Sequence, residues 1–173
     1  ASLNYNPFSS TALTGVVGAL YEPLFYMNNL KDDPTKLEPL MGKSYTISDD
    51  AKTIDVTIRD GEKWSDGKPY TAEDVAYTFN LLNSNKALNT SGFAGSAKVL
   101  SDTEVRITLD KPESVNALSY LSGTMIVPKH VWEKIDDPVT YTNKDAVGSG
   151  PFTVKGGNFS PTAYTFKKKD RKS

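Results

Sequence analysis

The chain has 173 residues, of which 38% are hydrophobic and 24% charged, and these proportions are typical of a folded single domain. Its 20 basic and 21 acidic residues leave no broad positive field, which argues against nucleic acid as a partner. The absence of cysteine excludes disulfide bonds, thiol catalysis and zinc sites built on thiolates. No segment approaches the ~20 consecutive apolar residues that a membrane-spanning helix needs.

The N-terminal part of the chain predicts one helix and two strands. Ser10 or Thr11 would cap a short helix over residues 12–21, whose side chains are mostly small or apolar. Short strands are expected over residues 24–26 and 39–47, separated by a polar turn.

Residues 49–82 contain the strongest local signals. Apolar and polar residues alternate there, as in a strand with one buried face, and the apolar set is Ile54, Val56 and Ile58. Asp60-Gly61 and Asp66-Gly67 predict two tight turns. Thr71 then begins a helix in which its hydroxyl would cap the amide of Asp74. An apolar stripe would pack this helix on the sheet: Val75, Phe79 and Leu82.

The second half of the chain continues the mixture of strands and helices. Residues 83–95 form a polar loop long enough to suggest a function. Residues 98–109 predict a hairpin whose second strand buries three residues: Val105, Ile107 and Leu109. The other expected elements are a short helix capped by Ser114 and running through Leu121, a buried strand over 125–127, a helix with Pro128 in its first turn, and strands over 152–155 and 163–166.

Together these elements predict an α+β fold in a single domain over residues 1–173. We expect a mixed, largely antiparallel sheet with two or three packed helices. The C-terminus is rich in basic residues, and we expect its last segment, residues 169–173, to be a disordered tail.

Five motifs follow one another along the chain in a characteristic order. They are Asn6-Pro7-Phe8, Leu20-Tyr21-Glu22-Pro23-Leu24, the stretch from Asp49 to Phe79, Asp102-Thr103-Glu104-Val105 and Gly148-Ser149-Gly150-Pro151-Phe152. This order resembles the bacterial extracellular solute-binding proteins of family 5, the peptide, nickel and oligosaccharide receptors of ABC importers. The resemblance implies part of lobe I of a two-lobed periplasmic-binding-protein-like fold (type II, cluster C), so the chain would be an N-terminal lobe fragment.

The resemblance also implies a function. The chain would belong to the substrate-binding component of an ABC-type importer, which binds a short peptide or an oligosaccharide in a cleft between its lobes. Its second partner would be the membrane permease of the importer. The full-length form would be extracellular or periplasmic, anchored to the membrane as a lipoprotein. No enzymatic activity, cofactor or metal is implied.

Ligand contacts are expected from aromatic and small residues on loops, because a flat ring offers apolar area with a polar edge and glycine lets a ligand approach the backbone. Glu22 is a further candidate, because a charge at the entrance to an apolar strand needs a partner such as a basic side chain or a ligand group. Trp64 and Trp132 are expected in the core. The predicted ligand-binding residues are Phe8, Ser9, Ser10, Tyr21, Glu22, Phe93, Gly123 and Thr124.

If the chain is one lobe of a two-lobed receptor, the wall facing the other lobe should be an exposed patch that contains Phe8, Tyr21 and residues 89–95. A contiguous apolar area is unusual on the surface of a monomer, so the patch predicts a two-fold homodimer of the isolated chain.

Two alternatives remain open. One is a glycoside hydrolase-like domain with two catalytic carboxylates, for which the adjacent acids Asp32-Asp33, Asp49-Asp50 and Asp136-Asp137 are candidates, although each pair stands beside a turn. The other is an interaction domain without a small ligand. The single histidine, His130, makes a serine–histidine triad a poor explanation.

Overall fold

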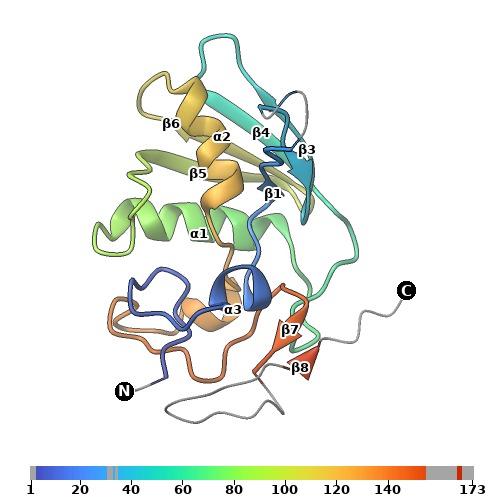
Figure 1. Ribbon diagram of the computed structural model, residues 1–173. Coiled ribbons are helices and arrows are strands. Elements are labelled where there is room, and N and C mark those ends of the chain that lie inside the picture. The colour runs from blue at the N-terminus through green and yellow to red at the C-terminus, as the bar shows by residue number, and fades with distance from the viewer. Residues whose placement is uncertain (1–2, 31–32, 34, 155–166, 169–173) are drawn as a thin grey trace.

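The computed structural model describes residues 3–30, 33, 35–154 and 167–168. In Figure 1 a four-stranded sheet with helices α1 (Ala72–Ser84) and α2 (Ser114–Gly123) forms the upper part of the molecule. The lower part consists of the N-terminal segment, the short helix α3 (Lys129–Trp132) and the paired strands β7 (Phe152–Thr153) and β8 (Lys167–Lys168). The chain therefore begins in the lower part, builds the upper part and then returns.

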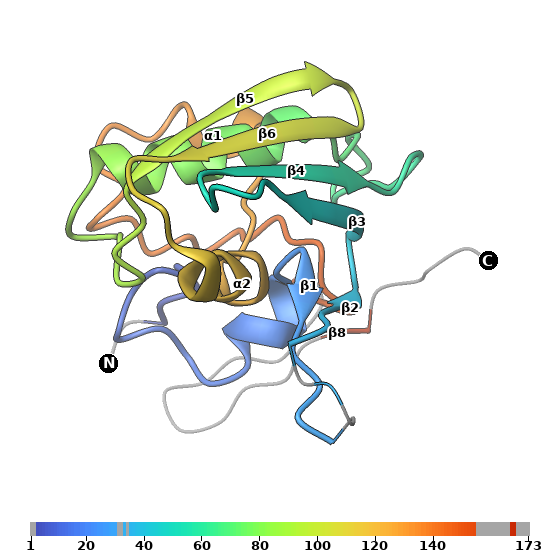
Figure 2. The same cartoon turned by 90° about the horizontal axis from the view of Figure 1, so that it is seen from above.

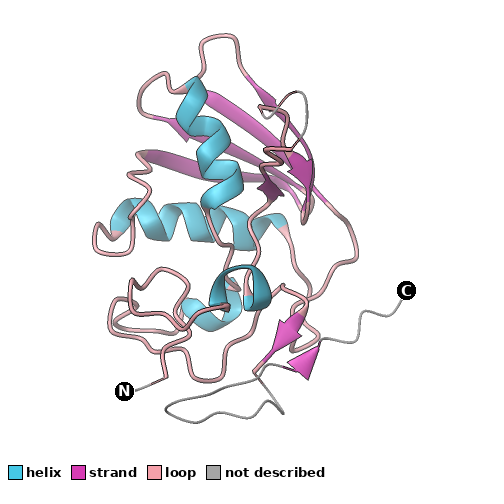
Figure 3. Cartoon of the chain, in the orientation of Figure 1, coloured by secondary structure: helices cyan, strands magenta, loops and turns pink. Residues whose placement is uncertain are grey.

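The sheet is antiparallel throughout and forms the frame of the upper part (Figure 3). Its strands, from one edge to the other, are β3 (Gly42–Ile47), β4 (Thr53–Ile58), β6 (Glu104–Leu109) and β5 (Gly95–Ser101). Val56 lies opposite Val105 on the buried face. Asp55 lies opposite Arg106 on the other face, and the guanidinium group contacts both carboxylate oxygens at 2.7 and 2.8 Å. The predicted alternation in both strands is confirmed.

Helices α1 (Ala72–Ser84) and α2 (Ser114–Gly123) pack on the buried face of this sheet (Figure 2). The N-cap predicted at Thr71 is confirmed, and its hydroxyl accepts a hydrogen bond at 3.3 Å from the amide of Glu73, the residue before the predicted donor Asp74. The carboxylate of Asp74 completes the capping box by accepting the amide of Thr71 at 3.0 Å. The predicted stripe of Val75, Phe79 and Leu82 is buried.

Two hydrophobic clusters fill the two parts. The upper cluster joins the sheet to α1 and α2, and its large side chains include Phe25, Trp64, Phe79, Phe93 and Tyr120. The lower cluster consists of Tyr5, Val16, Leu20, Tyr21, Met125, Val127, Trp132 and Ala146, with partly buried neighbours such as Phe8. Both tryptophans are buried, as predicted.

The helix predicted over residues 12–21 is wrong. The structure has instead a tight, kinked turn, η1 (Val16–Leu20), in which Val17 is extended and Gly18 has a φ of 85°. Gly15, just before it, also has a left-handed φ of 89°. Glycine adopts this conformation without steric cost, so the two glycines permit a reversal where the small residues had suggested a helix.

The strand predicted over residues 125–127 is also wrong, although all three residues are buried. The segment passes between the two clusters, and its amides bond to other partners. The amide of Ile126 donates to the carbonyl of Glu22 at 3.3 Å, and that of Val127 donates to the hydroxyl of Thr78 at 3.1 Å. The backbone of residues 125–127 therefore forms no ladder with a neighbouring strand, because Ile126 and Val127 bond to two different segments.

The remaining elements are short. The strand predicted over 39–47 is divided into β2 (Glu38–Pro39), which pairs with β1 (Phe25–Tyr26), and β3. Helix α2 begins at Ser114, but Glu113 is its N-cap and makes no side-chain cap hydrogen bond, so the predicted Ser114 cap is wrong. Strand β7 (Phe152–Thr153) pairs with β8 (Lys167–Lys168). The strand predicted over 163–166 and the tail over 169–173 lie outside the described residues.

Candidate functional site

A small cavity of about 60 Å3 lies between three segments that are distant in the sequence, and it is partly open to solvent. Three of the eight predicted ligand-binding residues line it: Phe8, Gly123 and Thr124. The other lining residues are Pro7, Leu82, Leu88, Thr90, Ser91 and Met125. None of the nine is charged, and the lining combines apolar side chains with hydroxyl groups. Such a lining suits a neutral ligand group.

The first wall is the N-terminal loop, which Asn6 holds in place. The Asn6 side chain is fully buried and donates to the carbonyl oxygens of Pro138 and Tyr141, both at 3.0 Å. Its own carbonyl oxygen accepts the amide of Phe8 at 3.0 Å. The ring of Phe8 then packs edge-on against Trp132, with 5.5 Å between the ring centres. Asn6 therefore positions Phe8 without touching the cavity.

The second wall is the loop after α1, which closes on Asn89. The Asn89 side chain donates to the carbonyl of Phe93 at 2.7 Å and accepts its amide at 3.0 Å. The hydroxyl of Ser91 also donates to Asn89 at 3.2 Å. Phe93 anchors the loop in the core, where its ring contacts Phe79 and Tyr120. The loop is therefore held in place by the side chain of Asn89 and by the packing of Phe93 in the core.

The third wall is the end of α2 and the residues that follow. The amide of Thr124 donates to the carbonyl of Tyr120 at 3.3 Å and closes the helix. Thr124 is buried, and its hydroxyl has no hydrogen-bond partner among the described residues. A Cβ atom added to Gly123 would have no described neighbour within 4 Å, so close packing does not require glycine at this position.

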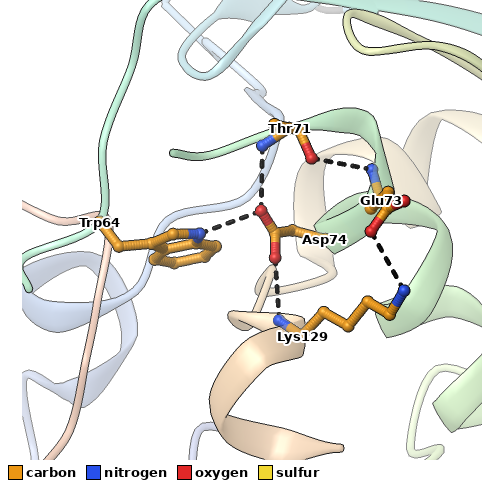
Figure 4. Close-up of polar contacts among 5 residues, drawn as sticks. All are labelled: Trp64, Thr71, Glu73, Asp74 and Lys129. Carbon is orange, nitrogen blue, oxygen red and sulfur yellow. Dashed lines mark hydrogen bonds and ion pairs between the residues drawn. The ribbon is translucent and has the colours of Figure 1, made fainter. Parts of the chain in front are cut away.

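The chain that follows this wall reaches α3 at Lys129, where the buried carboxylate of Asp74 fixes it to α1 (Figure 4). Asp74 accepts three N–H groups: the indole of Trp64 at 3.0 Å, the amide of Thr71 at 3.0 Å and the amide of Lys129 at 2.8 Å. The ammonium group of Lys129 meets Glu73 at 3.1 Å on the surface. Three donors compensate the burial of this carboxylate, which therefore acts as a structural joint between three elements.

The other predicted ligand-binding residues lie away from the cavity. Tyr21 and Phe93 are 0% and 2% exposed, so the predicted exposed patch is wrong. Tyr21 belongs to the lower cluster, where its hydroxyl accepts the side-chain amide of Asn143 at 2.8 Å and burial raises its pKa above the usual range. Tyr21 and Phe93 are buried because their loops pack against the two hydrophobic clusters. The local sequence does not show whether a loop packs in this way.

Ser9, Ser10 and Glu22 do not line the cavity either. Ser9 accepts the side-chain amide of Asn4 at 3.0 Å and the amide of Thr11 at 3.2 Å, so it shapes the N-terminal loop. Ser10 is exposed. The backbone of Glu22 bonds to the hydroxyl of Ser149 at 3.3 Å, and its partly buried side chain is one of the charges that raise the pKa of buried Tyr70, after burial itself and Asp74.

Three of the acidic residues considered for catalysis, Asp33, Asp50 and Asp137, accept hydrogen bonds from residues of their own turns. A hydrogen bond from Ser48, followed by one from the Lys52 amide, lowers the pKa of Asp50. Bonds from the Thr140 side chain and amide lower the pKa of Asp137 in the same way. A general acid in glycoside hydrolysis needs a raised pKa, so these two carboxylates do not favour that alternative.

A separate contact joins the second Asp-Gly turn to α3, with 2.7 Å between the Asp66 carboxylate and the Nε2 atom of His130. Partial burial opposes ionisation of Asp66, but the contacts with His130 and the Lys68 amide hold its pKa below the usual value. Among the described residues no group of three or more His, Cys, Asp or Glu side chains is placed to hold a metal ion. No described helix is long and apolar enough to span a membrane.

Sequence reasoning missed six of the nine lining residues. Thr90 and Ser91 fall in the loop over 83–95 that its length had marked as a candidate for function. Pro7 precedes the predicted residue Phe8 in the Asn6-Pro7-Phe8 motif. Leu82, Leu88 and Met125 carry only an apolar signal, which is the same for a core residue as for a pocket residue.

The fold matches part of the periplasmic binding proteins of type II. Residues 36–171 match the family described as Bacterial extracellular solute-binding proteins, family 5 Middle, and the chain belongs to this family. The family and fold are those of extracellular or periplasmic substrate-binding proteins, and the α+β class predicted from the sequence is confirmed.

Individual relatives agree with this assignment. The peptidoglycan-binding protein YepA of Agrobacterium fabrum is 32% identical over 164 residues, covering 87% of this chain and 26% of the relative. The periplasmic oligopeptide-binding protein of an oligopeptide ABC transporter from Thermotoga maritima superimposes with a TM-score of 0.85 at 29% identity, covering 96% of this chain and 31% of the other. A structure of that protein with bound mannohexaose gives a TM-score of 0.84 at 28% identity. The chain thus spans about a quarter to a third of the length of these proteins.

Proposed function

We propose that the chain belongs to the substrate-binding component of an ABC-type importer and contributes one wall of the site for a short peptide or an oligosaccharide. The observation that carries this proposal is the neutral cavity formed by Phe8, Ser91 and Thr124 from three separate segments. The family supports the role, and the relatives named above are described as binding peptidoglycan, oligopeptide and mannohexaose.

The wider assignments follow from the same family. Residues 1–173 would form part of the first lobe, and the importer's membrane permease would be the protein partner. The natural protein would act outside the cytoplasm as a lipoprotein and would bind rather than transform its ligand. Self-association as a homodimer stays a prediction, which sedimentation velocity would test. Tyr21 and Phe93 are buried, so they do not support it.

Nuclear magnetic resonance titration with tripeptides and with mannohexaose tests the binding role. One wall encloses only part of a ligand, so we expect weak binding, with a Kd of about 1 mM, and shifts of the amide signals of Ser91, Gly123 and Thr124. The absence of shifts at these residues with every peptide and sugar would contradict the proposal. Turnover of chromogenic glycosides that one carboxylate substitution abolishes would favour the hydrolase alternative instead.

A further inference from the structure

The chain contains two Asp-Gly dipeptides, Asp60-Gly61 and Asp66-Gly67. The amide nitrogen of a glycine can attack the side-chain carboxyl group of the aspartate before it, because glycine has no Cβ atom to hinder the approach. Both glycines are exposed and have left-handed φ values, of 74° and 86°. The two sites therefore carry the same reactive groups in similar turns, and the contacts around each site decide which of them reacts.

At the first site the two reactive groups are in contact. The amide of Gly61 donates a hydrogen bond to the side-chain carboxylate of Asp60 at 2.8 Å. Among the residues that the structure describes, neither this amide nor this carboxylate has another hydrogen-bond partner. Both residues are exposed to solvent. The nitrogen and the carboxyl group that must join are thus already together, and no bond to another residue has to be broken first.

At the second site both groups are held by other partners. The amide of Gly67 donates to the carbonyl of Trp64 at 2.9 Å. The carboxylate of Asp66 accepts the amide of Lys68 at 3.1 Å and contacts the ring of His130 at 2.7 Å. Although partial burial opposes ionisation, these contacts hold the pKa of Asp66 below its usual value, and the ionised carboxylate is the less reactive form. Three contacts therefore protect the second site.

We propose that Asp60-Gly61 is a site of spontaneous modification, at which Asp60 is converted to isoaspartate through a succinimide, while the fold protects Asp66-Gly67. In the first step the Gly61 nitrogen bonds to Cγ of the protonated Asp60 carboxyl group, and the amide proton and the hydroxyl group leave as water. Water then adds to the main-chain carbonyl carbon of Asp60 and breaks its bond to the Gly61 nitrogen. Water is the only co-reactant, and the mass of the protein is unchanged.

The modified turn lies between two fixed points of the backbone. The amide of Arg59 donates to the carbonyl of Met41 at 2.9 Å on one side, and the carbonyl of Glu62 accepts the amide of Tyr70 at 2.9 Å on the other. After the rearrangement the main chain passes through Cβ and Cγ of Asp60, which adds one methylene group between these points. The reaction therefore needs no opening of the sheet, and it does not depend on the binding function proposed above.

Peptide mapping of the folded 173-residue chain after several weeks in neutral buffer made with heavy-oxygen water tests the proposal. Hydrolysis of the succinimide leaves one heavy oxygen atom in the peptide, and electron-transfer fragmentation distinguishes isoaspartate from aspartate. Releasing one hydrogen bond slows a reaction by about fivefold, so three contacts should make Asp66 slower than Asp60 by at least about tenfold. Equal rates, or a faster reaction at Asp66, would overturn the proposal.

The same chain unfolded in guanidinium chloride is the matched control, because it keeps both dipeptides and removes the contacts around them. The rates at Asp60 and Asp66 should then agree within about threefold, since unfolding leaves only the neighbours in the sequence to differ. A ratio in the unfolded chain as large as that in the folded chain would show that the flanking residues set the difference. That result would contradict the protection of Asp66 by the fold.

His130→Ala separates the two sites within the folded chain, because it removes one contact of Asp66 and none of Asp60. Isoaspartate should form about fivefold faster at Asp66 in this variant, with no change at Asp60. Asp60→Glu should abolish heavy-oxygen labelling at the first site, because the longer side chain would have to close a six-membered ring. An unchanged rate at Asp66 in folded His130→Ala, or labelling that persists in Asp60→Glu, would contradict the mechanism.

Discussion

Gly148 lies directly against Leu20, so closely that a Cβ atom on Gly148 would overlap the carbonyl oxygen of Leu20. The amide and carbonyl of Gly148 bond to Ser65 at 3.2 and 3.0 Å. The next glycine, Gly150, donates its amide to the carbonyl of Leu20 at 2.9 Å. This contact joins three segments: the N-terminal turn at Leu20, the turn at Ser65 and the C-terminal segment at Gly148 and Gly150.

The first prediction concerns that contact. Gly148→Ala should destabilise the protein by about 3 kcal/mol or prevent folding, because backbone rather than a flexible side chain must move to make room. Gly123→Ala is the matched control, since its added methyl meets no described atom within 4 Å and alanine is the better helix former. Urea denaturation measures both. Equal stability of the two variants would mean that the backbone at Leu20 can move to make room for a methyl group at little cost in free energy, which would contradict the prediction.

The second prediction concerns the buried carboxylate of Figure 4. Asp74→Asn should cost about 3 kcal/mol, because one amide oxygen cannot accept the three N–H groups and its NH2 group must face one of them. Glu73→Gln alters the neighbouring exposed carboxylate, whose pair with Lys129 should contribute less than about 1 kcal/mol. If denaturation midpoints of the two variants agree within error, Asp74 is not the structural joint described above.

The third prediction concerns the two faces of β4. Val56→Asp places an unpaired charge in the upper cluster and should abolish folding. The control is Thr57→Lys, because Thr57 lies opposite Glu104 on the other face and a lysine there gains a cross-strand partner. Circular dichroism and gel filtration decide the outcome. A folded Val56→Asp protein together with an unfolded Thr57→Lys protein would invert the assignment of the faces.

The fourth prediction is a pH dependence. Burial and the 2.7 Å hydrogen bond to Glu113 raise the pKa of Tyr120 to about 12. The folded state therefore favours the protonated phenol, and this contribution is full below the unfolded pKa of about 10 and is lost as the pH rises through about 12. The stability difference between the natural chain and Tyr120→Phe should accordingly shrink from pH 9 to pH 12. A difference that stays constant over this range would contradict the assignment.

Local patterns in the sequence predicted most of the upper part correctly. The alternation in β4 and β6, the cap at Thr71 and the stripe of α1 depend on residues close together in the chain, so the local sequence carries the information. The turn η1 shows the limit of such reasoning. Its residues are small and apolar, as in a helix, but Gly15 and Gly18 allow a reversal that tertiary contacts then select.

The cavity could be predicted only in part, because its walls meet through tertiary packing. Phe8, Ser91 and Thr124 come from three separate segments, and no spacing in the sequence relates them. Tyr21 and Phe93 had the same loop-aromatic signal as Phe8, but the two clusters enclose them. The structure separates a ring that lines a cavity from one that fills a core, and the residue type alone does not.

Helix α1 belongs to both clusters at once. Its residues Val75 and Phe79 lie in the upper cluster, while Tyr77 and Leu81 pack against the lower one. Loss of this helix would therefore expose both cores together, and neither part retains a complete core without it. The two parts should consequently unfold in one cooperative transition, with the amides in the middle of α1 among the slowest to exchange with deuterium.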